Sequence, residues 1–156
     1  MFPRVSLALL GALSLGLITS PAAAAATKVT CRPTQVTATV SETFRNTTST
    51  TFVPLAEAGG RFVQGGSEPS CVMVRFEGYV ATTNNAVLTI SASIDDETIA
   101  PDQVQLLGIP LYEPRAWTFI IPRVAPGKHR IKFVFRSNNG NSVGFNASNT
   151  IIQHAP

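Results

Sequence analysis

Side chains that bind metals or carry out redox chemistry are scarce in this chain of 156 residues. There are two cysteines, Cys31 and Cys71, and two histidines, His129 and His154. A structural zinc site usually takes four such ligands, and neither cysteine has a histidine near it in the sequence. The scarcity argues against a zinc site and leaves the cysteines available for a disulfide. No cofactor is expected.

Charged residues and helical patterns are also sparse. Charged side chains make up 13% of the chain, about half the usual share. No window keeps the 3.6-residue apolar period of an amphipathic helix. If residues 1–26 are removed, Arg4 is lost, and eleven basic and nine acidic residues leave a net charge of +2. A charge this small predicts no nucleic-acid partner.

The N-terminus has the layout of a secretory signal. Arg4 gives a short positive region, residues 5–18 form an apolar run, and residues 22–26 are alanines that offer cleavage sites. The run is shorter than the roughly 20 residues that span a bilayer, and no later segment is apolar enough. We expect residues 1–26 to be a cleaved signal peptide and residues 27–156 to form one secreted or periplasmic domain. The alternative is an uncleaved anchor helix.

The two cysteines are expected to form a disulfide. Export places Cys31 and Cys71 in an oxidising compartment, where an even cysteine count favours a bond between them. Closing a loop of about 40 residues stabilises the folded state by roughly 4 kcal/mol on the chain-entropy model. Two free thiols are the alternative.

Two-residue alternation of apolar and polar side chains, interrupted by turn residues, runs through the rest of the chain. In residues 128–137, Ile131, Phe133 and Phe135 alternate with basic side chains. The other clear stretches are residues 71–80, 86–94 and 117–121. The Asn-rich segments 82–85 and 137–141 are typical of hairpin turns. The pattern predicts an all-β fold, an antiparallel β-sandwich or jelly roll.

The N-terminal half of this domain has a weaker pattern. Residues 35–44 predict a strand with Val36, Ala38 and Val40 on one face. Shorter strands are expected at residues 50–55, where Pro54 favours an edge position, and at residues 61–64. Residues 99–114 are predicted to be a long loop with one short strand at residues 104–107.

Five segments carry a family resemblance: CVMVRF at 71–76, WTF at 117–119, PGKHRI at 126–131, RSNNG at 136–140 and TII at 150–152. Over residues 50–154 they resemble a group of small secreted bacterial proteins of uncharacterised function. The strand order also looks loosely like the jelly roll of the C1q/tumour-necrosis-factor type. The resemblance implies export and a sandwich, and it brings no catalytic residues.

A basic stripe is the first candidate binding site. Lys128, Arg130, Lys132 and Arg136 share one face of a predicted strand. They are candidates for binding an anion or a partner: a sulfated or phosphate-rich glycan, an anionic lipid headgroup or an acidic protein. The alternative is that these charges keep an exposed sheet soluble. A pair between Arg75 and Glu77 on neighbouring strands would neutralise part of the stripe.

An acidic cluster is the second candidate. Asp95 and Asp96, with Asp102 nearby, are hard oxygen ligands that suit calcium. The spacing and the glycine of an EF-hand are absent, so a solvated turn is the alternative. Paired carboxylates also serve glycoside hydrolysis, but adjacent residues at a strand end fit that geometry poorly.

Residues 140–144, GNSVG, match the G-x-S-x-G string of hydrolases. That motif needs a strand, a sharp turn and a helix, and the residues that follow here predict a strand. His154 follows the serine, but no acidic residue lies after Glu113. A hairpin is therefore favoured over a nucleophile.

The sequence favours a non-enzymatic, secreted or periplasmic binding module whose partner, a glycan or a protein, contacts its loops or an exposed sheet face. A structural jelly-roll oligomer is the alternative, with Met73, Tyr79 and Val87 forming an apolar patch. A hydrolase is a minor alternative.

Overall fold

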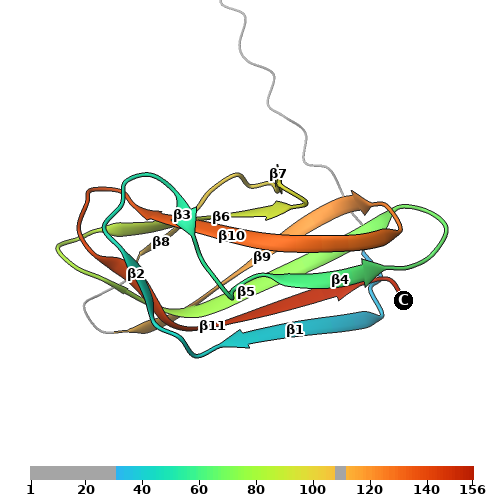
Figure 1. The fold of residues 1–156 in the computed structure, drawn as a ribbon, viewed down its shortest axis with the longest axis horizontal. Coiled ribbons are helices and arrows are strands. Elements are labelled where there is room, and N and C mark those ends of the chain that lie inside the picture. The colour runs from blue at the N-terminus through green and yellow to red at the C-terminus, as the bar shows by residue number, and fades with distance from the viewer. Residues whose placement is uncertain (1–30, 108–111) are drawn as a thin grey trace, which may run out of the picture.

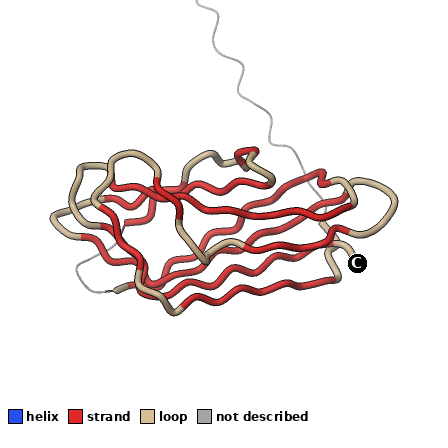
Figure 2. The backbone as a smooth tube through the Cα atoms, viewed as in Figure 1, coloured by secondary structure: helices blue, strands red, loops and turns tan. Residues whose placement is uncertain are grey.

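The computed structural model of the protein describes residues 31–107 and 112–156. In these two ranges every regular element is a strand, as Figure 2 shows. No helix in them is long and apolar enough to cross a membrane. The expected signal peptide lies outside the described residues. The strands are β1 (Gln35–Ser41), β2 (Arg45–Thr47), β3 (Val53–Pro54), β4 (Gly60–Gln64), β5 (Ser70–Thr82), β6 (Val87–Ile94), β7 (Glu97–Thr98), β8 (Val104–Leu107), β9 (Glu113–Val124), β10 (Gly127–Ser137) and β11 (Val143–His154).

The strands form two facing antiparallel sheets (Figure 1). Sheet A has the order β1-β11-β5-β9, with β2 also paired to β11. Sheet B has the order β3-β10-β6-β7, with β4 also on β10 and β8 also on β6. If β1 and β2, β3 and β4, and β7 and β8 are each counted as one position, each sheet has four positions. The chain then changes sheet at every step except from β6 to β7. This is the jelly-roll arrangement, so the predicted fold class is confirmed.

The core lies between the sheets because each long strand turns alternate side chains inward. Phe76 of sheet A contacts Phe133 of sheet B, with ring centroids 4.9 Å apart, and Phe145 lies 5.1 Å from Phe76. All three rings are buried. Burying one such side chain stabilises the fold by about 1.5–3 kcal/mol, and the contact between Phe76 and Phe133 joins the two sheets.

The two Asn-rich turns are present, but the predicted hairpins are wrong. β5 belongs to sheet A and β6 to sheet B, so residues 83–86 form an arch between sheets. Residues 138–142 join β10 to β11 in the same way. Asn84 and Asn85 adopt positive φ angles of 49° and 56°, and Gly140 one of 83°. Turn chemistry reverses the chain, but it does not decide whether the two strands pair.

The edge strand β1 forms where predicted but ends at Ser41, and its apolar face is exposed. Val36, Ala38 and Val40 share a face as predicted, but that face points outward from sheet A, with Val36 62% and Val40 69% exposed. The inward positions hold Thr37 and Thr39, and Thr39 lies against Gly60 of β4. Two-residue alternation predicts which side chains share a face of the strand, but it does not say whether that face points into the core or into solvent.

The predicted disulfide between Cys31 and Cys71 is confirmed. The two Cα atoms are 5.2 Å apart, and the residues are 40 positions apart in the sequence. The bond ties the segment before β1 to the beginning of β5, a central strand of sheet A. It therefore closes a loop that contains β1, β2, β3 and β4.

Candidate anion-binding face

The basic stripe lies on the outer face of sheet B, along β10. Ile131, Phe133 and Phe135 point into the core, so the alternate positions face outward. All four predicted side chains, Lys128, Arg130, Lys132 and Arg136, occupy these outward positions. The structure therefore brings the predicted residues onto one surface.

The half of the stripe near the end of β10 has partners of its own. The Lys132 ammonium pairs with the Asp96 carboxylate. Arg136 donates a hydrogen bond to Gln103 Oε1 at 3.1 Å, and its guanidinium lies 4.8 Å from the ring centroid of Phe52. These two cations are engaged in holding neighbouring loops against sheet B.

The other half of the stripe gains a cation from β4. Arg61 is the cross-strand partner of Arg130, and Lys128 lies opposite Val63. We name Arg61, Lys128 and Arg130 the cationic ledge. All three are exposed, and none of their side chains has an ion pair or hydrogen bond among the described residues. Like charges directly opposite on a sheet destabilise it, so the ledge is retained at some cost to stability.

Two hollows lie on either side of the Arg61–Arg130 pair. One, of about 390 Å³, includes Phe62, Val63 and Lys128 in its lining. The other, of about 550 Å³, runs along residues 54–60 and the outward side of Lys132. Both include Arg61 and Arg130. The second hollow lies where residues 55–59, between β3 and β4, do not pair with β10 as a strand. A backbone hydrogen bond of 2.9 Å from Leu55 N to Phe133 O still ties this segment to β10.

The turn between β6 and β7 supports the beginning of the ledge. His129 Nδ1 lies 2.6 Å from Asp95 Oδ2, and His129 Nε2 donates to the carbonyl of Ala125 at 2.8 Å. The backbone N–H of Arg130 donates to Asp95 Oδ1 at 2.9 Å. Asp95 thus fixes the backbone next to Arg130 and the ring beside it.

The same contacts set the acidity of Asp95. Burial acts to raise the pKa of this carboxyl. The hydrogen bonds from His129 and from the backbone N–H of Arg130, together with the charges of His129 and Lys132, outweigh burial and hold the pKa below its ordinary value of 3.8.

We expect Asp95→Asn to lower the free energy of unfolding at neutral pH by about 0.2–1 kcal/mol, as for a partly exposed ion pair. Because the folded-state pKa of Asp95 is depressed, its contribution is complete above pH 3.8 and is lost as the pH falls through the folded-state value. The difference between the two proteins should therefore shrink below pH 3.8. Urea unfolding at several pH values measures it, with Asp102→Asn as the control. A difference that grows below pH 3.8 would contradict this assignment.

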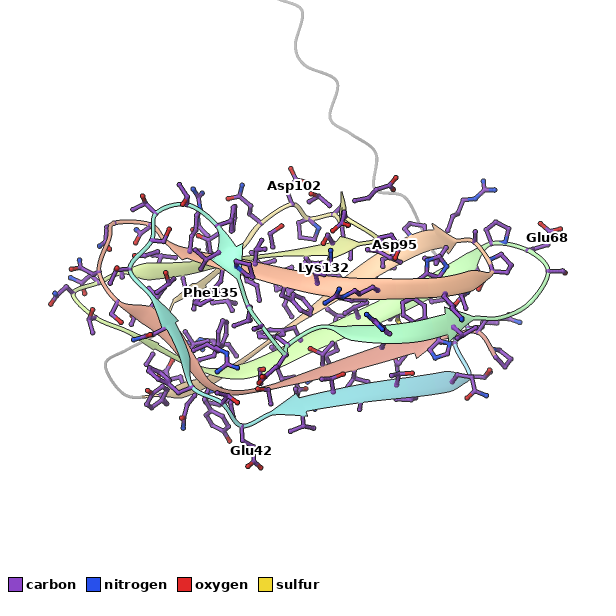
Figure 3. All side chains as sticks on the ribbon, in the orientation of Figure 1. Glu42, Glu68, Asp95, Asp102, Lys132 and Phe135 are labelled. Atoms are coloured by element: carbon purple, nitrogen blue, oxygen red, sulfur yellow. A yellow bond between two sulfur atoms is a disulfide. The ribbon has the colours of Figure 1, made fainter. Side chains whose placement is uncertain are left out.

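The calcium prediction finds no support in this geometry. Asp95 faces His129, Asp96 pairs with Lys132, and Asp102 projects from the loop between β7 and β8 (Figure 3). Among the described residues, no group of three or more Asp, Glu, His or Cys side chains is placed to hold a metal ion. Asp95 instead contacts the His129 ring and the backbone N–H of Arg130, and Asp96 pairs with the Lys132 ammonium.

The G-x-S-x-G string lies on the arch into β11 and does not form a strand–turn–helix. The carbonyl of Ser142 accepts a hydrogen bond from Thr83 N at 2.9 Å. His154 is at the far end of β11, roughly 35–40 Å away at about 3.3 Å per residue. His154 is also buried, with Nε2 3.3 Å from Thr37 Oγ1.

Other predicted surface residues are divided between the two sheets. Met73 and Tyr79 face outward on β5 in sheet A, whereas Val87 belongs to β6 in sheet B, so the three do not form one patch. Arg75 and Glu77 do pair, but within β5 on the face opposite the stripe. That pair therefore does not neutralise the cationic ledge.

Sequence reasoning missed Arg61. Its neighbours GGRFVQGG predict a short strand, but no local signal indicates which strand pairs with it. The register that places Arg61 opposite Arg130 is a property of the tertiary fold. An arginine at an outward position of a strand flanked by Gly pairs was the one available hint.

No family model and no curated protein match the chain. Among solved structures, it is similar to the CBM36-1 domain of a multidomain xylanase from the hindgut metagenome of Trinervitermes trinervoides. The TM-score is 0.47 at 14% identity, over 78% of this chain and 99% of that one. The C-terminal domain of the sugar-binding protein EclA gives a TM-score of 0.43 at 8% identity, over 78% and 82% of the two chains.

A third similar structure is dimeric latent PorU from Porphyromonas gingivalis, with a TM-score of 0.42 at 8% identity. The alignment covers 76% of this chain and 13% of PorU. The resemblance to the C1q/tumour-necrosis-factor type is not confirmed.

Proposed function

We propose that this protein is an exported, non-enzymatic binding module that holds an anionic polysaccharide on the cationic ledge of sheet B. The observation that carries the proposal is the placement of Arg61 directly opposite Arg130, with no ion pair to either guanidinium among the described residues. Asp95 and Glu57 each line one of the two hollows, but Asp95 pairs with His129 and Glu57 pairs with Arg45. In the free protein the two positive charges repel each other. An anion bound between them attracts both, so the electrostatic energy of the pair becomes favourable in the complex.

The side chains of the ledge suit sulfate or carboxylate groups. A guanidinium presents several N–H donors in a planar fork and binds such groups through two parallel hydrogen bonds. Two arginines side by side can engage one anionic group from two directions, and Lys128 adds a point charge two residues along β10.

The hollows beside the ledge favour an extended ligand. Their volumes, about 390 and 550 Å³, fall in the usual range for ligand sites, and Arg61 and Arg130 lie between them. A polymer chain crossing the arginine pair can place its rings in both hollows. A single small anion would use only the pair.

The location and the absence of catalysis are part of the proposal. The Cys31–Cys71 disulfide supports a compartment outside the cytoplasm, as does the leader-like N-terminus. The four side chains of the stripe are lysines and arginines, whose fixed positive charge suits binding better than proton transfer.

Binding to a charged polymer tests the proposal. We expect the protein to bind dextran sulfate, with affinity falling as salt is raised, and to leave unsulfated dextran unbound, because the contacts are between exposed charges. Isothermal titration calorimetry with both polymers measures this. Equal affinity for the two dextrans would contradict a charge-based site. Preference for polyglutamate or for anionic lipid vesicles over dextran sulfate would contradict the polysaccharide assignment.

A further inference from the structure

The strand β1 leaves one edge of sheet A open. β1 pairs with β11 on one side, and no described strand pairs with its other side. Its seven residues lie along the lower border of the molecule in Figure 1. Alternate residues of such an edge direct N–H and C=O groups outward, where another strand can pair with them.

The edge at β1 lacks the protection that the other edges have. Natural sheets discourage pairing at an edge with charged residues, prolines or short strands. The opposite edge of sheet A, β9, contains Pro114 and Pro122 as well as charged residues. In sheet B the edge strands are short, and all but the four-residue β8 contain a proline or a charge. β1 has neither charge nor proline.

The sequence of β1 is symmetric about its centre. Residues 36–40 read Val-Thr-Ala-Thr-Val, flanked by Gln35 and Ser41. If two copies of β1 pair antiparallel about Ala38, Val36 of each lies opposite Val40 of the other on the outer face. On the inner face Thr37 lies opposite Thr39. Cross-strand pairs of β-branched and threonine side chains stabilise a sheet.

Exposure supports the same pairing. Val36 and Val40 are 62% and 69% exposed, the highest fractions among the large apolar side chains of the described residues. Pairing would cover both valines and satisfy the outward backbone groups of β1 in a single contact. A two-fold contact between identical edges closes on itself and does not extend into a fibre.

We propose that β1 pairs with β1 of a second copy of this chain, joining the two A sheets into one across a two-fold axis at Ala38. The inference is independent of the proposed function, because the cationic ledge belongs to sheet B. The dimer presents two ledges, which strengthens binding to a polymer through a second, intramolecular contact.

Light scattering after size exclusion tests the dimer. The full-length chain is purified and its N-terminus is determined by mass spectrometry, so that the expected monomer mass is known. We expect a mass of two chains that falls towards one on dilution, since association follows mass action. A mass of one chain at every concentration would overturn the proposal.

Two lysine variants locate the contact. Ala38→Lys puts two like charges face to face on the axis, so we expect the mass to fall twofold, to one chain. Thr118→Lys places the same charge on the outer face of the opposite edge strand, β9, and should leave the dimer intact. A dimer that survives Ala38→Lys, or one lost equally in both variants, would contradict the pairing.

Cysteine cross-linking fixes the register even if a lysine variant folds poorly. Opposed residues in an antiparallel pair have Cα atoms about 4.5–5.5 Å apart, within the range of a disulfide. Ala38→Cys should therefore cross-link across the axis under mild oxidation. Val36→Cys should not, because its two copies would lie roughly 13 Å apart along the strands. Cross-linking of Val36→Cys without Ala38→Cys would overturn the register.

Discussion

Removing the disulfide with Cys31→Ser and Cys71→Ala is expected to lower the free energy of unfolding by about 4 kcal/mol. The bond joins residues 40 positions apart, and a loop of that length loses much conformational entropy when it is closed in the unfolded chain. Serine suits the half-buried position of Cys31, and alanine avoids placing a hydroxyl at the buried position of Cys71.

A loss of that size is a large part of the total stability of a domain, which is typically 5–15 kcal/mol. Urea unfolding of the variant and of the wild type measures it, and the wild type unfolded in reductant is the matched control. Both reduced forms should show the same lowered midpoint. A difference below about 1 kcal/mol from the oxidised wild type would contradict the loop-entropy account, and it is the result expected if the reduced, unfolded chain kept residual structure between residues 31 and 71.

The sheets of this protein are predictable from sequence because burial imposes a two-residue period. Phe133 and Phe135 alternate with Lys132 and Arg136, and the structure places them inside and outside as that pattern predicts. The short strand at residues 104–107 and the edge position of Pro54 are confirmed for similarly local reasons.

Strand pairing is not predictable in this way. Asn84 and Asn85 favour a tight reversal, but the two strands they join enter different sheets, because each has a buried face that the opposite sheet covers. The same limit applies to the candidate site. Lys128 and Arg130 are recognisable on one strand, whereas Arg61 joins them only through the register between β4 and β10.

The second large effect is expected from Arg61→Gln. An arginine that donates to a charged ligand group contributes about 1.5–3 kcal/mol, so the affinity for dextran sulfate should fall roughly tenfold or more. The dependence of affinity on salt should weaken as well, since one fewer charge takes part.

The stability of the same variant should change in the opposite direction. Arg61 and Arg130 are like charges directly opposite on one face of a sheet, so replacing one should raise the free energy of unfolding by roughly 0.2–1 kcal/mol. A residue that merely supports the fold would lower it. The combination of weaker binding and higher stability therefore distinguishes a binding residue from a structural one.

Arg75→Gln is the matched control because it removes the same charge from the opposite face of the sandwich. Arg75 pairs with Glu77 on β5, and exposed pairs of this kind contribute little. The affinity of Arg75→Gln for dextran sulfate should stay within twofold of the wild type. If the polymer were attracted only by the net positive charge of the protein, both variants would lose affinity equally.

The titration of dextran sulfate into Arg61→Gln, beside the wild type and Arg75→Gln, tests the cationic ledge most directly. The ledge predicts a roughly tenfold or greater loss of affinity in Arg61→Gln alone. An unchanged affinity in Arg61→Gln, or an equal loss in Arg75→Gln, would contradict binding at the Arg61–Arg130 pair.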